Sequence, residues 1–520
     1  NIPTLLALSA LAIGLYLFQG LFETIRSQIL VRVGASMDRK LGPLAHKVTI
    51  DMPRHGFSPS EALERGRDVD TIRGFLSSQA PMALFDLPWM PVYLVFVYLL
   101  HPYLGALVIA GAVVLSVLAI TAEIFTRRIA GKAHKAMMAR NALADSNARN
   151  AEVLHAMGFA GRAVERFQAA NAEHLDLMTG TSDVSGSLSA VSRALRMMLQ
   201  SATLGLGAYL VIQGEMSAGS IIAASITSSR ALAPVDLAIG NWKNIVNARG
   251  AWARIKESMA ALENAVKQMP LPRPKSDLKV EKLTVAAPAS GRVLLAEVSF
   301  DLKAGQALGV VGSSGGGKTT LVRALTGIWQ PLRGSVRLDD ADLAQWPADS
   351  VSSIIGYLPQ DVSLIDGTIE ENIARLDQEA DPKAVVAAAQ AAGIHSMIVR
   401  MPDGYRTQVG VGGHVLSAGQ RQRIGLARAL YGNPFLVIMD EPNSNLDSDG
   451  EQALTDAIQG IKARGGIAVV VAHRPSALVA VDLIAVIQNG KLAGFGNKDD
   501  ILSPGKSQKV QPLRPPVMAG

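Results

Sequence analysis

A glycine-rich run from Gly312 to Thr319 has the spacing G-x-x-x-x-G-K-T. It follows an apolar segment, 307–311, and precedes a helix-like segment, 319–325, which is the strand–loop–helix setting of a phosphate-binding loop. Glycines let backbone N–H groups turn toward phosphate oxygens, and the start of the following helix adds partial positive charge. We expect Lys318 to reach the β- and γ-phosphates of a nucleotide and the Thr319 hydroxyl to bind Mg²⁺. The predicted loop comprises Gly312, Ser313, Ser314, Gly315, Gly316, Gly317, Lys318, Thr319 and Thr320.

Two adjacent carboxylates end a second apolar run. Residues 435–439 are uninterrupted apolar side chains, typical of a strand buried on both faces of a parallel sheet. Asp440 is then placed to hold Mg²⁺, and Glu441 is placed to polarise an attacking water. Such a pair also suits a helix start or a solvated edge, but the buried strand before it favours a nucleotide-hydrolysing site.

The composition indicates a membrane protein with a second, soluble part. Of the 520 residues, 49% are hydrophobic and only 18% are charged, and the length is too great for one core. The absence of cysteine excludes a disulfide scaffold and a thiol-ligated metal. The net charge of +6 is spread through segments that flank apolar spans, without the basic and aromatic stripe of a nucleic-acid groove. We therefore expect no nucleic-acid partner.

Hydropathy predicts membrane-spanning helices in the first half of the chain. Long segments between them, 22–81 and 127–196, are rich in Lys and Arg, whereas the short turns 101–102 and 214–216 have none. By the positive-inside rule the long segments and the nucleotide-binding part lie in the cytoplasm. The five candidate spans, each of about 20 apolar residues, are 2–21, 82–100, 103–125, 197–212 and 218–239.

An odd number of spans places Asn1 on the far side of the membrane. We expect one earlier span, six in all, with a native five-span chain as the alternative.

Three prolines in 270–274 indicate an extended linker. The predicted organisation is a membrane domain over 1–262 with long intracellular helices, a linker over 263–277, an α/β nucleotide-binding domain with a helical subdomain over 278–502, and a disordered tail over 503–520.

The order of these motifs resembles the ATPase domain of ABC transporters over about 278–500. The resemblance makes Gln360 the glutamine that contacts Mg²⁺ or the lytic water, and His473 the histidine on the γ-phosphate. Asp447 would close the loop after the catalytic glutamate. The resemblance also implies two chains, because each ATP lies between the phosphate loop of one chain and the signature motif of the other. That motif is Leu416, Ser417, Ala418, Gly419 and Gln420.

Long intracellular helices before one C-terminal ATPase domain resemble the exporter branch of that family. Within it, the chain is similar to the type I secretion permease/ATPases that export metalloproteases and lipases. In the exporter branch a short helix in each intracellular loop docks on the ATPase domain, and we expect these helices near 36–49 and 158–167. The segments that carry the closer resemblance are 15–19 (LYLFQ), 68–75 (DVDTIRGF), 85–91 (FDLPWMP), 416–430 (LSAGQRQRIGLARAL), 440–446 (DEPNSNL) and 472–477 (AHRPSA).

The resemblance implies a homodimer in the bacterial inner membrane, surrounded by lipid. It implies ATP and Mg²⁺ as ligands and export of an unfolded polypeptide through a periplasmic adaptor and an outer-membrane channel. Two alternatives stay open. One is a lipid or small-molecule exporter of the same architecture, and the other is an ATP-binding membrane scaffold that transports nothing. Glu441 and His473 argue against a scaffold without ATPase activity.

Three features depart from the wider exporter pattern. Val411 replaces an acidic residue often found shortly before the signature motif, so we expect coupling between the ATPase and membrane domains to be built differently. Ala286 and Ala287 stand where an aromatic residue usually stacks on adenine, so the base must rely on apolar contact, with Val293 as a candidate. Ala418 replaces a glycine that is common in the signature motif, a difference of one methyl group.

Charged residues inside the predicted spans are a second set of candidates. Asp86 lies in the second span, and Arg230 and Asp236 interrupt the last. Intramembrane charges are costly and often face a cavity or a partner. Arg230 is therefore a candidate for the translocation path, and the alternative is that all three lie near the cytoplasmic interface. Pro88 and Pro91 are expected to kink the second span.

Overall fold

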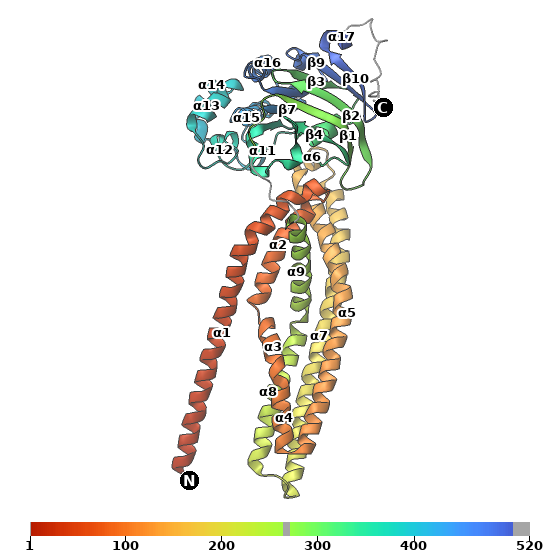
Figure 1. The fold of residues 1–520 in the computed structure, drawn as a ribbon. Helices are drawn as coiled ribbons and strands as arrows, with labels where there is room; N and C mark the ends of the chain where they lie inside the picture. The colour runs from red at the N-terminus through yellow and green to blue at the C-terminus, as the bar shows by residue number, and fades with distance from the viewer. Residues whose placement is uncertain (1, 264–270, 503–520) are drawn as a thin grey trace, which may run out of the picture. The chain divides into compact units, whose positions relative to one another are not determined.

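The computed structural model describes residues 2–263 and 271–502 (Figure 1). The chain divides into a helical unit that reaches residue 265 and an α/β unit that begins at residue 266. Residues 264–270 of the predicted linker and the predicted tail, 503–520, lie outside the described residues.

The helical unit consists of long helices joined by short turns. In its described part, five helical segments are long and apolar enough to cross a membrane, and they contain the five stretches that hydropathy predicted. That prediction is confirmed. In order, the elements are α1 (Ile2–Asp51), η1 (Met52–His55), α2 (Pro59–Leu76), α3 (Ala80–Asp86), η2 (Leu87–Trp89), α4 (Met90–Leu100), α5 (Pro102–Arg149), α6 (Ala151–Ala156), α7 (Ala160–Ile212), α8 (Ala218–Gly240) and α9 (Trp242–Glu263).

Helices α5 and α7 lie side by side along much of their length (Figure 1). A small residue allows their close approach, because a Cβ atom built on Gly111 would lie 2.2 Å from Cδ2 of Leu199. Close packing of this kind is what holds helices together where both are surrounded by lipid. Nearer the turn between α4 and α5, a buried apolar cluster joins α4, α5, α7 and α8 through Val97, Leu104, Val108, Leu210 and Ala224.

The second span is not one regular helix. A 3₁₀ turn, η2, separates α3 from α4, and Pro88 lies within it. Proline lacks the N–H that an α-helix needs, so it interrupts the helical hydrogen bonds. The predicted distortion at Pro88 and Pro91 is therefore present.

The predicted short intracellular helices are wrongly placed. Residues 36–49 continue α1 without a break, and residues 160–167 already belong to α7. The separate short elements are η1 and α6 instead. The breaks occur where glycine takes a left-handed conformation, at Gly56 (φ +89°) and Gly158 (φ +70°), and this conformation ends a helix readily only at glycine.

The α/β unit contains two sheets. The larger has the order β10-β9-β3-β8-β7-β6 and is parallel except at β10, and the smaller, β2-β1-β4-β5, is antiparallel. The strands are β1 (Asp277–Ala286), β2 (Val293–Lys303), β3 (Ala307–Val311), β4 (Arg333–Leu338), β5 (Ala341–Asp342), β6 (Ile355–Leu358), β7 (Leu436–Asp440), β8 (Ile467–Val471), β9 (Leu483–Gln488) and β10 (Lys491–Asn497). The helices are α10 (Lys318–Leu325), η3 (Leu343–Gln345), α11 (Ala348–Ile354), α12 (Ile369–Ile373), α13 (Pro382–Ala391), α14 (His395–Val399), η4 (Gly404–Arg406), η5 (Val411–Gly413), α15 (Ala418–Leu430), α16 (Ser448–Ala463), η6 (Pro475–Leu478) and α17 (Lys498–Leu502).

Apolar cores cover both faces of the parallel sheet. Successive side chains of a strand point to opposite faces, so Val437 and Met439 join one core while Leu436 and Ile438 join the other. The first core packs against α12–α16, and the second packs against α10 and the antiparallel sheet. All of β7 is buried, which fixes the position of the two carboxylates at its end.

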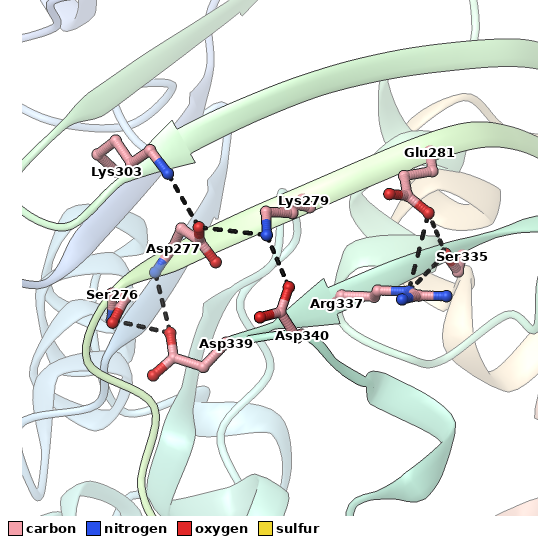
Figure 2. Close-up of polar contacts among 9 residues, drawn as sticks. All are labelled: Ser276, Asp277, Lys279, Glu281, Lys303, Ser335, Arg337, Asp339 and Asp340. Atoms are coloured by element: carbon pink, nitrogen blue, oxygen red, sulfur yellow. Dashed lines mark hydrogen bonds and ion pairs between the residues drawn. The ribbon is translucent and has the colours of Figure 1, made fainter. Parts of the chain in front are cut away.

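Polar contacts fix the beginning of β1 between β2 and the turn after β4 in the antiparallel sheet (Figure 2). The Asp339 carboxylate accepts hydrogen bonds from the backbone N–H groups of Lys275 (2.6 Å), Ser276 (2.8 Å) and Asp277 (2.9 Å). Lys279 lies between Asp340 (2.6 Å) and Asp277 (3.6 Å), and it lowers the pKa of the exposed Asp340 carboxyl. The chain is therefore anchored where β1 begins.

Candidate nucleotide-binding and hydrolysis site

The phosphate loop joins β3, which lies inside the parallel sheet, to α10. A Cβ atom on Gly312 (φ +154°) would lie 2.0 Å from the carbonyl oxygen of Ile487, so no other residue fits there without movement. Gly317 (φ +107°) precedes α10 in a left-handed conformation. Ser313, Ser314 and Gly315 are exposed. The loop therefore has a fixed base and an open face, as a phosphate cradle requires.

Lys318 is the first residue of α10, and its ammonium group lies inside the loop. Nζ donates hydrogen bonds to the carbonyl oxygens of Gly312 (3.0 Å) and Ser313 (2.9 Å). Burial lowers the pKa of Lys318, and the charges of Glu441 and Asp440 oppose that shift. The lysine is therefore a largely dehydrated cation beside an open loop, where an entering phosphate would gain a strong charge-assisted hydrogen bond.

Asp440 lies at the buried end of β7 and has an unused acceptor. Its Oδ1 atom is buried and has no hydrogen-bond partner among the described residues. Burial raises the pKa of Asp440, while a hydrogen bond from Thr319 partly opposes that shift. A buried carboxylate oxygen without a partner is costly. Asp440 and the Thr319 hydroxyl thus form a pair of oxygen donors that suits a hard cation such as Mg²⁺.

Glu441 follows at a sharp turn (φ +49°), and both of its carboxylate oxygens have partners. Nε2 of His473 lies 3.0 Å from Oε1, and Nε2 of Gln360 donates to Oε2 at 3.2 Å. The Glu441 N–H donates to Val471 O at 3.0 Å, which extends the pairing of β7 with β8. The structure therefore brings Gln360, Glu441 and His473 together from three separate loops.

The signature motif begins α15. Ser417 is the N-cap, and it forms a reciprocal capping box with Gln420, through Ser417 N–H to Oε1 (2.9 Å) and Gln420 N–H to Oγ (3.2 Å). A Cβ atom on Gly419 would lie 2.8 Å from Asn445 O, which brings the motif close to the loop before Asp447. Among the described residues, no hydrogen bond joins 416–420 to 312–320. Leu416 is buried, whereas Ser417 and Ala418 are exposed, so the N-terminus of α15 is accessible.

Asp447 is the N-cap of α16 and accepts a hydrogen bond from the Gly450 N–H at 2.9 Å. Arg423 of α15 lies 3.7 Å from the same carboxylate. The loop that joins β7 to α16 is thus held by contacts to α15 and α16.

Sequence reasoning missed Gln422. It is buried, and its Nε2 donates to the carbonyl oxygens of Pro442 (2.6 Å) and Glu441 (3.3 Å). This side chain therefore connects the signature helix directly to the turn that carries Glu441. The sequence did offer a signal, because Gln422 lies on the same helix face as Leu426 and Ala429 and a polar residue there is expected to be buried.

The region predicted to receive adenine contains small residues. Ala286 ends β1 and pairs with Val293, the first residue of β2, whose side chain is 47% exposed. The Ala287 N–H donates to Arg292 O at 2.9 Å and closes the turn. The accessible apolar surface of Val293 fits its predicted role, which stays a prediction.

Two family models match the chain, one for each unit. Residues 2–232 match the ABC transporter transmembrane region, and residues 295–444 match the ABC transporter model.

Relatives share nearly the whole chain. It is 48% identical to the type I secretion system ATP-binding protein PrsD of Rhizobium meliloti, over 96% of this chain and 86% of PrsD. It is 28% identical to the leukotoxin translocation ATP-binding protein LktB of Mannheimia haemolytica, over 95% of this chain and 70% of LktB.

A solved structure has the same fold. A bacterial Atm1-family ABC exporter with ATP bound superimposes with a TM-score of 0.81 at 24% identity, covering 95% of this chain and 87% of that one. The chain belongs to the ABC transporters of exporter type, in the group of type I secretion permease/ATPases, and is an ATPase coupled to transport.

Proposed function

We propose that this protein is the inner-membrane ATPase of a type I secretion system and exports unfolded polypeptides. The observation that carries the proposal is the similarity to PrsD, which spans both units. LktB, named for leukotoxin translocation, is also similar along the chain. A periplasmic adaptor and an outer-membrane channel are the expected partners of such a protein.

The donor set at the end of β7 fits Mg²⁺. Asp440 and Thr319 would hold the ion, with Gln360 as a further ligand, and the orphaned buried oxygen of Asp440 supports this assignment. A bound Mg²⁺ ion would neutralise charge on the β- and γ-phosphates of ATP.

The contacts support a proposal for the hydrolytic roles. The loop N–H groups and Lys318 bind the phosphates, and Glu441 accepts a proton from the attacking water. Both carboxylate oxygens of Glu441 have partners in the described chain, so Gln360 and His473 have to give up or share these contacts when a water is bound. His473 would then be free to donate to the γ-phosphate.

We further propose a homodimer with two composite sites. Ser417 caps a helix whose N-terminus is accessible, and no hydrogen bond in the described chain joins it to the phosphate loop. A helix N-terminus binds anions well. The proposal places the γ-phosphate of one chain's ATP against the signature motif of the partner.

The test is ATPase activity of the purified protein in lipid, with and without a C-terminal peptide of a secreted protease encoded beside the transporter. We expect the peptide to change the rate, and the change to vanish in Glu441→Gln. Activity that ignores the peptide but responds to lipid or small apolar compounds would favour the other exporter class.

A further inference from the structure

Two of the three charges identified inside the spans are neutralised within the chain. Asp86 pairs with Arg26 of α1 at 2.8 Å. Asp236 pairs with Arg196 of α7 at 2.7 Å. Ion pairs of this kind reduce the cost of placing charge in a membrane.

Arg230 is different. Its Nη2 donates to Oε1 of Gln19 on α1 at 3.0 Å, and no carboxylate lies within ion-pair distance of it among the described side chains. Nε2 of the Gln19 amide donates to Oε1 of Glu23 at 2.8 Å. The Gln19 amide is thus oriented between a cation and an anion, with its oxygen toward the guanidinium.

Arg230, the charge without an ion pair in the described chain, also lies deeper in the predicted span than Asp236. Arg230 follows Ala218, the first residue of α8, by twelve residues, which is ~18 Å along a helix, whereas Asp236 lies ~27 Å along it. The hydrocarbon core is about 30 Å thick. With the outer boundary of the core taken at Ala218, the Arg196–Asp236 pair lies near the inner boundary and Arg230 lies ~12 Å inside it. A deep cation without a counter-charge calls for an anion from outside the chain.

We infer that Arg230 binds side-chain carboxylates of the polypeptide in transit, and that the Gln19 oxygen occupies the carboxylate position when no cargo is present. This inference rests on the proposed export of polypeptides. A guanidinium offers two parallel N–H donors that match a carboxylate, and such charge-assisted bonds are about twice as strong as neutral ones. An entering Asp or Glu would therefore displace the single bond to Gln19. Lipid phosphates lie outside the hydrocarbon core, which favours the polypeptide as the source of the anion.

The experiment uses two unfolded peptides of identical length, one containing Asp and Glu and the other containing Asn and Gln at the same positions. The whole protein is placed in nanodiscs of zwitterionic lipid, and the peptide concentration that half-maximally changes the ATPase rate is measured. We expect the acidic peptide to act at a roughly tenfold lower concentration.

Variants with opposite expected effects sharpen the test. Arg230→Gln should remove the difference between the peptides, and Arg230→Lys should keep part of it. Gln19→Ala removes the competing acceptor and should lower the half-maximal concentration of the acidic peptide. The control is Arg193→Gln, since Arg193 is an exposed arginine of α7 without an ion pair among the described residues. It should keep the wild-type difference.

Each contrary outcome has a separate meaning. Equal potency of the two peptides in the wild type would overturn the carboxylate site and leave polypeptide export standing. Loss of the acidic preference on adding anionic phospholipid would identify Arg230 as a lipid-phosphate site and overturn the assignment to cargo. If neither peptide changes the rate, the proposed function itself fails, and this inference fails with it.

Discussion

Both carboxylate oxygens of Glu441 contact residues with other expected roles, Gln360 at Mg²⁺ or the lytic water and His473 at the γ-phosphate. His473 lies 3.0 Å from one oxygen and Gln360 lies 3.2 Å from the other. Binding of ATP and a water must therefore exchange these contacts. The ATPase rate should depend on that exchange as well as on the proton transfer itself.

Replacing Glu441 by Gln should reduce ATP turnover by about 10²- to 10⁴-fold, because the amide cannot accept the proton of the attacking water. Binding of a fluorescent ATP analogue should persist, since the phosphate loop is unchanged. Glu281→Gln, at a surface carboxylate on β1, is the matched control and should turn over normally. Persistent turnover in Glu441→Gln would show that another group is the base.

Asp440 should control both the acid limb of activity and the stability of the free protein. Burial raises the pKa of Asp440, so this carboxylate takes up a proton at a higher pH than an ordinary Asp. Mg²⁺-dependent activity should fall as the pH is lowered and Asp440 becomes protonated. Asp440→Asn should lower activity by about a hundredfold or more. It should also raise the Tm of the nucleotide-free protein, because it removes a buried charge.

The sign of that effect follows from linkage. A carboxyl group with a raised pKa in the folded state destabilises the fold as pH rises through that pKa. The Tm advantage of Asp440→Asn over the wild type should therefore be absent in acid and grow toward neutral pH. A constant difference across pH, measured by differential scanning fluorimetry, would contradict a role for the Asp440 charge.

At the scale of elements, the Gln422 side chain joins α15, which carries the signature motif, to the turn after β7. Gln422→Met removes both hydrogen bonds to the carbonyl oxygens of Glu441 and Pro442. The buried Pro442 oxygen then has no other donor among the described residues, while Glu441 O keeps the Ser444 N–H at 3.3 Å. We expect a loss of about 1–3 kcal/mol of unfolding free energy and a lower kcat. Gln452→Met, on the exposed face of α16, is the control, and equal effects in both variants would contradict the assignment.

The phosphate loop offers two glycines that separate crowding from backbone strain. Gly312→Ala would place Cβ 2.0 Å from Ile487 O and should cost about 3 kcal/mol or more. Gly315→Ala has open space around Cβ and pays only for its left-handed backbone (φ +73°), about 1–2 kcal/mol. Urea unfolding of both variants measures the difference, and equal costs would contradict the crowding at Gly312.

For the whole molecule, the central expectation is that each ATP site is shared between two chains. Ser417→Asp keeps a good N-cap but places a negative charge where a γ-phosphate would bind. Lys318→Ala disables the phosphate loop. Each variant alone should be inactive, yet mixed dimers of the two should regain one intact site.

The matched control for that mixing experiment is the double variant co-assembled with the wild type. Such a dimer has one defect in each composite site and should stay inactive. If it were active while the mixed single variants stayed inactive, each site would lie within one chain.

The sequence alone determined the two-part organisation, the five apolar helices and the nucleotide chemistry. Those properties depend on local patterns, namely hydropathy over a span, the spacing of a glycine loop, and a buried strand that ends in carboxylates. Asp440 and Glu441 could be located in this way because β7 is buried on both faces.

Only the tertiary structure decided what depends on contacts between distant segments. The short intracellular helices were misplaced because the helix periodicity of 36–49 and 158–167 gives no sign of where a backbone turns. That is decided at Gly56 and Gly158. The place of Gln422 on the apolar face of α15 indicates burial, but its partners are backbone carbonyl groups of a distant turn, and only the structure shows them. Arg230 and Asp236 look alike in the sequence, because both are charges in one apolar span. Only the packing shows that Asp236 has a counter-charge within the chain, whereas Arg230 contacts the neutral amide of Gln19.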